Sequence, residues 1–301
     1  MSNPIDRRDL LITGATAALA FSTDSAVLSN PESVAQQAWK PKKAVLYGML
    51  PASLSAEDRF KLARDVGFEG VEAPRCTPQE AEIFRKAADR AGIRIHSIIF
   101  GGWDAPFSSS DAAVIKRGME QVKTNLQSAQ IMGCDGILLV PAVVNAGVRY
   151  VDAYKRSQEN IRKLIPEAER RKVMINIEEV WNNFLLSPIE FAKYIDEFRS
   201  PWIGAYFDVG NVVRFAWPED WILTLGKRIR KVHIKDFKGG PGLGTGGQWV
   251  NLSEGSINWR AVRQAFMDVG YTGFMTTELG SGDEPYLRDV SARVDKIIAG
   301  T

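Results

Sequence analysis

Four side chains that could bind a metal ion follow four apolar segments of the chain. Glu178, Asp208, His233 and Glu278 each lie at or just past the end of a run that predicts a β-strand. These runs are residues 173–177, 203–207, 229–232 and 273–277. Helical periodicity between the runs predicts parallel strands, whose carboxyl ends share one face of the sheet. Three carboxylates and one imidazole there would suit a divalent ion, with Mn²⁺ expected first and Mg²⁺, Co²⁺ or Zn²⁺ also compatible.

Three of these four positions also allow another interpretation. Glu178 and Glu179 cannot both face the mouth of the sheet, because successive strand side chains alternate, and Glu178 is preferred. Asp208 is followed at once by Val209-Gly210, so it could instead cap a helix. His233 is one of only two histidines in the chain, which favours a ligand over a packing or surface role.

The elements that must position these residues form eight strand-and-helix units. Strands are predicted at residues 44–50, 70–73, 93–99, 136–140, 173–177, 203–207, 229–234 and 273–277. Helices are predicted near residues 56–66, 78–91, 111–132, 150–171, 188–198, 218–225, 259–269 and 285–298. Eight alternating units predict an α/β fold in one domain, a (β/α)₈ TIM barrel over residues 44–301.

Residues typical of helix ends support these boundaries. Thr77 and Ser187 each precede a proline, which fits an N-cap followed by proline at the first helical position. Glycines follow four of the helical runs just before a strand, where a left-handed C-cap is expected, at Gly67, Gly92, Gly133 and Gly270.

Composition argues against several classes of protein. Hydrophobic residues make up 45% and charged residues 25% of the 301 residues, as in an ordinary globular protein. With 38 basic and 36 acidic side chains and no basic block in the body of the chain, no nucleic-acid partner is expected. A small-molecule carbohydrate is the expected partner, with a homo-oligomer as a further expectation. Cys76 and Cys134 are interpreted as packing residues.

The first 43 residues resemble an export signal and a linker. Arg7-Arg8 precedes the apolar stretch 11–20, which ends in the small-residue pattern Ala18-Leu19-Ala20. This combination predicts a twin-arginine signal and a periplasmic or exported protein. The stretch is too short to stay in a bilayer, which needs roughly 20 apolar residues, so no membrane association is expected after signal removal. The alternative is an amphipathic N-terminal helix in a cytoplasmic protein.

The predicted site could remove a proton next to a carbonyl group. A metal ion would act as a Lewis acid that stabilises the enediolate, while Glu178 and Glu278 would serve as base and acid on opposite faces of the substrate. Two bases on opposite faces give epimerisation, one base serving both carbons gives isomerisation, and a leaving group β to the carbanion gives elimination. The metal site alone does not choose among the three.

The order Glu, Asp, His, Glu on strands five to eight resembles the xylose isomerase-like barrels. These include ketose 3-epimerases, hydroxypyruvate isomerases and AP-endonuclease-2 domain proteins. The resemblance covers residues 44–298 and is carried by four phrases, GFEGVE at 67–72, FDVGN at 207–211, VHIKD at 232–236 and EGSINW at 254–259. It implies one divalent ion held by Glu178, Asp208, His233 and Glu278, with the two glutamates also catalytic.

The chain departs from the epimerase pattern at two positions. Asn211 stands where epimerases often carry a histidine that helps hold the substrate carbonyl; it can donate a hydrogen bond but cannot shuttle a proton. An arginine that follows the seventh-strand histidine in some epimerases is absent, because a glycine-rich run, 239–247, occupies that region. Lys235 is the candidate replacement, or else pairs with a neighbouring carboxylate.

Other candidates for substrate contact come from strand ends and loops. Trp103 and Trp181 could stack on a sugar or serve as lids or oligomer contacts, and His96 could equally be a packing residue. Beyond Asn211 and Lys235, the candidates are Glu72, His96, Trp103, Trp181 and Asn182. The run 239–247 lacks the spacing of a phosphate loop and is interpreted as a flap.

The leading hypothesis is a divalent-metal-dependent sugar isomerase or epimerase that acts on a ketose or ketose derivative. One alternative is a lyase that cleaves 3-keto glycosides by the same enolate chemistry, and another is a barrel that binds a sugar without turning it over. A three-zinc nuclease is disfavoured because it needs more than the two histidines present.

Overall fold

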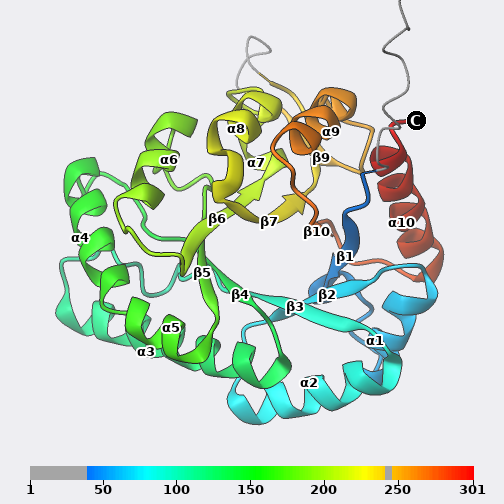
Figure 1. The fold of residues 1–301 in the computed structure, drawn as a ribbon, viewed down its shortest axis with the longest axis horizontal. Coiled ribbons are helices and arrows are strands. Elements are labelled where there is room, and N and C mark those ends of the chain that lie inside the picture. The colour runs from blue at the N-terminus through cyan, green and yellow to red at the C-terminus, as the bar shows by residue number, and fades with distance from the viewer. Residues whose placement is uncertain (1–38, 241–245) are drawn as a thin grey trace, which may run out of the picture. The chain divides into compact units, whose positions relative to one another are not determined.

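The computed structural model describes residues 39–240 and 246–301, and within these residues eight parallel strands close a barrel (Figure 1). The order around the barrel is β1-β10-β7-β6-β5-β4-β3-β2, which confirms the predicted (β/α)₈ TIM barrel. The strands are β1 (Lys42–Leu46), β2 (Gly70–Pro74), β3 (Arg94–Ile99), β4 (Gly136–Leu139), β5 (Met174–Glu178), β6 (Ile203–Asp208), β7 (Ile229–Ile234) and β10 (Phe274–Thr277). The predicted signal lies in residues 1–38, outside the described residues.

Helices surround the barrel on its outer side (Figure 1). They are α1 (Ala56–Asp65), α2 (Pro78–Ala91), α3 (Ala112–Met132), α4 (Tyr150–Arg162), α5 (Ile165–Arg171), α6 (Pro188–Asp196), α7 (Val209–Val212), α8 (Pro218–Leu225), α9 (Trp259–Asp268) and α10 (Glu284–Ala299). None of the described helices is long and apolar enough to cross a membrane.

The predicted helix ends are confirmed. The side chains of Thr77 and Ser187 accept hydrogen bonds from the backbone of the first turns of α2 and α6, each ahead of a proline. Gly67, Gly92, Gly133 and Gly270 all have positive φ, between 68° and 100°, which only glycine adopts without strain.

Strand alternation sorts apolar side chains outward and polar ones inward. On β7, Val232 and Ile234 join the apolar core between the barrel and the helices, and they alternate in sequence with Lys231 and His233. A period of two therefore sends Lys231, His233 and the following Lys235 to the interior. The barrel interior thus carries a column of polar residues that leads up to its mouth.

Two predicted elements differ from the structure. The run 44–50 forms a strand only up to Leu46, and the chain then turns into a short 3₁₀ helix, η1 (Tyr47–Met49), whose Tyr47 and Met49 are buried. The run is apolar because these residues are buried, and an apolar run alone does not distinguish a buried strand from a buried turn. The predicted helix 150–171 is two helices, because Pro166 has no backbone N–H to continue α4.

Two short strands on either side of the glycine-rich run pair with each other. Strands β8 (Asp236–Lys238) and β9 (Gln248–Val250) pair antiparallel, with Phe237 opposite Trp249. Gly247 has φ 153°, and a Cβ there would lie 2.3 Å from the Phe237 ring, so this position requires glycine. Residues 241–245 of the predicted flap lie outside the described residues.

Candidate metal and acid–base site

The four predicted ligands meet at the carboxyl-terminal end of the barrel. Glu178 ends β5, Asp208 ends β6, His233 lies on β7 and Glu278 directly follows β10. One ligand atom from each lies within 4.8 Å of the others. These strands are neighbours in the order β10-β7-β6-β5, so the strand-end argument accounts for their convergence.

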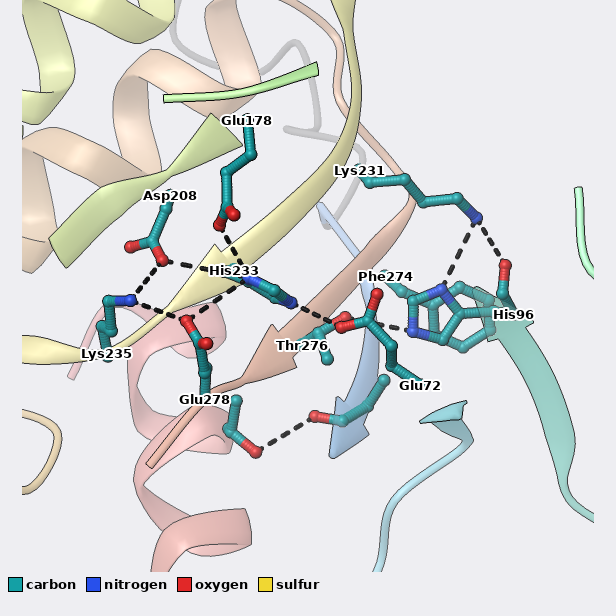
Figure 2. Close-up of polar contacts among 12 residues, drawn as sticks. Glu72, His96, Glu178, Asp208, Lys231, His233, Lys235, Phe274, Thr276 and Glu278 are labelled. Atoms are coloured by element: carbon teal, nitrogen blue, oxygen red, sulfur yellow. Dashed lines mark hydrogen bonds and ion pairs between the residues drawn. The ribbon is translucent and has the colours of Figure 1, made fainter. Parts of the chain in front are cut away.

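His233 lies at the centre of this cluster, fully buried. Its Nδ1 is 3.2 Å from Glu178 Oε1, 3.5 Å from Glu278 Oε2 and 3.9 Å from Asp208 Oδ2. Figure 2 shows Glu178 and Glu278 approaching the imidazole from opposite sides. One ring nitrogen therefore faces all three carboxylates.

Asp208 caps a helix and also faces the cluster, so its ligand role stays a prediction. Its Oδ1 accepts hydrogen bonds from the backbone N–H groups of Gly210 and Asn211, which caps α7. Its Oδ2 is buried and faces the cluster. The cap fixes the carboxylate and leaves one oxygen for a ligand.

Lys235 projects into the same cluster. Its Nζ is 2.8 Å from Asp208 Oδ2 and 2.6 Å from Glu278 Oε2, the neighbouring carboxylates that the sequence allowed (Figure 2). Burial opposes the charged form, but Asp208 and Glu278 outweigh it and raise the pKa of Lys235 above its usual value. The ammonium group thus offsets part of the negative charge at the mouth.

The two glutamates have different electrostatic environments. Burial raises the pKa of Glu178 to about 7, although the neighbouring His233 acts in the opposite direction. Burial would also raise the pKa of Glu278, but His233 and Lys235 outweigh it and lower that pKa to about 2. A bound cation would favour the ionised form of both, so these values describe the protein alone.

Glu179, the other candidate on β5, supports the loop instead of facing the four ligands. Its Oε1 accepts a hydrogen bond from the backbone N–H of Asp208, and its Oε2 is buried without a partner among the described residues. Burial raises the pKa of Glu179 well above its usual value. Strand alternation thus separates Glu178 from Glu179 as expected.

The structure places Glu72 and His96 inside the barrel, fully buried. Glu72 Oε2 lies 2.5 Å from His233 Nε2, on the side of the ring away from the other carboxylates. His96 stacks on Phe274 at 4.4 Å between ring centroids, and its Nε2 lies 3.1 Å from the hydroxyl of Thr276. Their expected contact with a substrate stays a prediction.

The remaining polar candidates form hydrogen bonds to the loop backbone. The Asn182 side chain donates to the Ala142 carbonyl at 2.6 Å and accepts from the Phe184 N–H, so it is engaged within its own loop. The Asn211 side chain donates to the Glu179 carbonyl at 2.9 Å. Both side chains hold the loops that surround the cluster.

The two candidate tryptophans lie in different surroundings. Trp103 is 53% exposed on the loop after β3, whereas Trp181 belongs to an aromatic cluster beside the site. The Trp181 ring stacks on Trp249 at a centroid distance of 5.0 Å, and Phe237 packs edge-on against both. The Trp181 indole N–H donates to the Asn211 carbonyl at 2.8 Å, which fixes its ring. The substrate roles expected for both tryptophans stay predictions.

A cavity of about 550 Å³ opens beside Lys235 and Glu278. Its other walls are Trp249, Val250, Asn251, Leu279, Gly280 and Tyr286. Sequence reasoning missed Trp249 and Tyr286. The signal for Trp249 is its place two residues after the glycine-rich run, in the return strand of a hairpin. Nothing in the sequence distinguishes Tyr286, on the first turn of α10, from an ordinary surface residue.

The donor set fits a hard or borderline divalent cation. Glu178, Asp208, His233 and Glu278 offer three carboxylate oxygens and one imidazole nitrogen, and the buried Asp208 Oδ2 shares the Lys235 ammonium with Glu278. Such an oxygen is stabilised by a bound cation. The set does not by itself select one ion.

Comparisons with known sequences agree with this arrangement. A sequence profile described as xylose isomerase-like TIM barrel matches residues 60–295. A protein of Escherichia coli with the provisional name L-ribulose-5-phosphate 3-epimerase is 27% identical over 262 residues, covering 81% of this chain and 91% of its own length. A protein of Haemophilus influenzae with the same provisional name is 24% identical and covers 84% and 94% of the two chains.

Solved structures share the fold at lower identity. An L-ribulose 3-epimerase superposes with a TM-score of 0.73 at 20% identity, covering 86% of this chain and 95% of its own. A D-psicose 3-epimerase solved with D-fructose gives 0.72 at 16% identity, with 86% and 100% covered. A Mycobacterium smegmatis barrel in complex with magnesium gives 0.68 at 17% identity, with 87% and 97% covered.

Proposed function

The chain belongs to the xylose isomerase-like TIM-barrel family, and from this premise we propose that it is a divalent-metal-dependent sugar isomerase or epimerase acting on a ketose or ketose derivative. The observation that carries the proposal is the convergence of Glu178, Asp208, His233 and Glu278 within 4.8 Å at the barrel mouth. The epimerase names of the curated relatives support the same reaction class.

Two carboxylates on opposite sides of the cluster can move a proton. Glu178 and Glu278 approach His233 from opposite sides (Figure 2), so a substrate carbon held between them has a carboxylate on each face. One glutamate takes the proton from the carbon next to the carbonyl, and the other returns a proton on the opposite face, which inverts that carbon.

The other charged groups would bind and orient the substrate. A divalent ion, proposed as Mn²⁺ and held by the four ligands, would supply Lewis acidity that stabilises the negative charge of the enediolate. The Lys235 ammonium, already within reach of Glu278, would donate a hydrogen bond to a substrate oxygen.

The cavity favours a neutral sugar over a phosphorylated one. Among the described residues that line it, Lys235 is the one cationic side chain, and two carboxylates already neutralise its charge. A phosphate group would bring nearly two negative charges to a cavity that offers no basic side chain besides Lys235 among the described lining residues. The indole of Trp249, 45% exposed and held by Trp181, instead offers an apolar face to the C–H surface of a sugar.

The test of the reaction is proton exchange in D₂O. Purified protein loaded with Mn²⁺ is incubated with free ketoses, ketose phosphates and 3-keto glycosides, and NMR follows deuterium incorporation, new sugars and released aglycone. We expect deuterium next to the carbonyl, lost in Glu178→Gln and Glu278→Gln but retained in Glu82→Gln, a matched change on the exposed face of α2.

The product of this experiment selects the reaction. A new ketose indicates epimerisation, an aldose indicates isomerisation, and a released aglycone indicates the lyase. No exchange with any sugar in the panel would contradict catalysis and favour a barrel that only binds sugar.

The contribution of Trp249 is tested with whichever ketose exchanges fastest. Trp249→Ala should raise its KM about tenfold, the equivalent of about 1.4 kcal/mol, because the stacking face is lost. Trp217→Ala, a change of the same size at an exposed position before α8 and outside the cavity, should leave KM unchanged. Equal effects of the two changes would exclude Trp249 as part of the substrate site.

We also propose export through the twin-arginine route. The pair Arg7-Arg8 ahead of an apolar stretch supports this location. Changing both arginines to lysine should leave the full-length protein in the cytoplasm, whereas the unchanged chain should appear in the periplasmic fraction in a shortened form. A homo-oligomer stays a prediction, which light scattering of the purified protein would test.

A further inference from the structure

The imidazole of His233 lies between acidic groups at both of its ring nitrogens. Nδ1 faces the three carboxylates of the candidate metal site, whereas Nε2 lies 2.5 Å from Glu72 Oε2 (Figure 2). Both side chains are fully buried, so water does not compete for this contact. A carboxylate can only accept, so an ionised Glu72 requires the proton to stay on Nε2.

Glu72 has no other clear role in the described part of the chain. Its second oxygen, Oε1, is buried without a hydrogen-bond partner there. A buried carboxylate is costly unless it is paired or acts on a metal site. The short contact of Glu72 is to His233, with the Tyr206 hydroxyl as a further polar neighbour of the carboxylate, so the placement of Glu72 on β2 serves this histidine.

The surroundings of the imidazole hold it in one orientation. The Tyr206 ring is tilted against the His233 ring at a centroid distance of 4.4 Å, and it is fully buried. His233 is flanked on the neighbouring strands by Asp208 of β6 and Thr276 of β10. The ring therefore cannot rotate without disturbing the barrel interior, so Nδ1 stays directed at the three carboxylates and Nε2 at Glu72.

We propose that Glu72 is a positioning residue for the metal site: it accepts a hydrogen bond from Nε2–H of His233 and so leaves Nδ1 unprotonated as the metal ligand. A histidine ligand whose second ring nitrogen donates to a carboxylate has a fixed tautomer and is a stronger ligand. The inference rests on the metal site of the proposed function but does not depend on the substrate or the reaction.

The decisive measurement is the tautomer of His233 in the metal-bound protein. The chain contains only two histidines, so protein labelled with ¹⁵N-histidine gives a spectrum of two rings, and His233→Gln assigns the signals. With Zn²⁺, which is diamagnetic, we expect a His233 ring protonated on Nε2 and metal-bound at Nδ1. A metal-bound ring protonated on Nδ1, or metal at Nε2, would overturn the proposal.

Metal affinity, measured by calorimetry with Mn²⁺, tests the role of Glu72 without any substrate. Glu72→Leu removes the acceptor and should weaken binding about 10- to 100-fold. Glu72→Gln keeps a carbonyl oxygen that can accept from Nε2–H, so it should restore most of this loss. This rescue distinguishes positioning from a requirement for the glutamate charge.

Ser97→Ala provides the matched control. Ser97 lies directly opposite Glu72 on β3, is fully buried, and its hydroxyl has no hydrogen-bond partner among the described residues. Its loss should leave metal affinity unchanged. Equal Mn²⁺ affinities of Glu72→Leu and the unchanged protein would also overturn the proposal. If Glu72→Leu fails to fold, the tautomer of His233 in the NMR spectrum of the unchanged protein still tests the proposal.

These results are independent of the search for a substrate. Absence of proton exchange in D₂O would contradict the proposed reaction and leave the tautomer and the metal affinities as they are. Conversely, a His233 ring bound through the wrong nitrogen would remove the role of Glu72 while Glu178 and Glu278 could still exchange a proton.

Discussion

At the scale of single residues, Lys235 explains how three carboxylates share the barrel mouth. Its Nζ lies within 2.8 Å of Asp208 and 2.6 Å of Glu278, so it neutralises charge that would otherwise be unpaired. A bound cation would offset the same charge. Lys235 and a bound metal ion would therefore stabilise the same carboxylates, so the effect of removing this lysine should depend on whether metal is present.

Lys235→Met should destabilise the metal-free protein by about 3 kcal/mol, because removing one partner of a buried pair leaves the others uncompensated. Urea unfolding with and without Mn²⁺ would measure this, and Mn²⁺ should recover a large part of the loss. Lys238→Met, an exposed position on β8, serves as the control with an effect within about 0.5 kcal/mol. A metal-free Lys235→Met protein as stable as the unchanged one would show that Lys235 does not balance this charge.

The sequence predicts the candidate ligand residues better than the residues that support them. Glu178, Asp208, His233 and Glu278 are recognisable because ligand chemistry recurs at four strand ends. Glu72 also follows an apolar run, but its contact with Nε2 of His233 depends on how the barrel closes. Around the barrel, four strands separate β2 from β7 in one direction and two strands in the other. That contact is a property of barrel closure and has no local signal.

At the scale of elements, Asp236 ties the hairpin to the loop before α9. Its Oδ1 accepts from the Phe237 N–H, and its Oδ2 accepts from the Ser253 N–H and the Trp259 indole N–H. Gly255 packs so closely that a Cβ there would lie 2.0 Å from Asp236 Oδ1. Two phrases that are separate in sequence, VHIKD and EGSINW, therefore form one structural unit under Trp249 and the cavity.

Asp236→Asn should cost about 1 to 3 kcal/mol of stability, because an amide nitrogen in place of one oxygen leaves a buried N–H donor without its acceptor. Thermal and urea unfolding would measure this loss. Asp89→Asn, on the exposed surface of α2, should change stability by no more than about 0.5 kcal/mol. An Asp236→Asn protein as stable as the Asp89→Asn control would contradict the anchoring role.

Local signals explain which elements are predictable. Helix caps such as Thr77 with Pro78 fix the start of α2, because hydrogen bonding and proline geometry act within a few residues. The end of β1 at Leu46 and the pairing of β8 with β9 are missed, because both depend on contacts with distant segments. An apolar run indicates that a segment is buried, but whether the buried segment is a strand or a turn depends on its contacts in the closed barrel.

At the scale of the whole molecule, the candidate metal site joins consecutive strands of the closed barrel. Its ligands come from β5, β6 and β7 and from the residue after β10, which are neighbours around the barrel. The unfolded chain does not hold these four groups together, since Glu178 and Glu278 are far apart in sequence. A cation that binds here therefore binds the folded barrel and stabilises it.

Thermal unfolding should show this stabilisation directly. At a free Mn²⁺ concentration of 100 times Kd, binding adds about 2.7 kcal/mol. This should raise Tm by about 5 to 10 °C for a domain of this size. Asp208→Asn keeps the cap of α7 but loses the charge that faces the site, so its gain with Mn²⁺ should fall to about 1 °C or less. An equal gain in Asp208→Asn would place the cation elsewhere, and no gain in the unchanged protein would contradict a divalent-metal site at the barrel mouth.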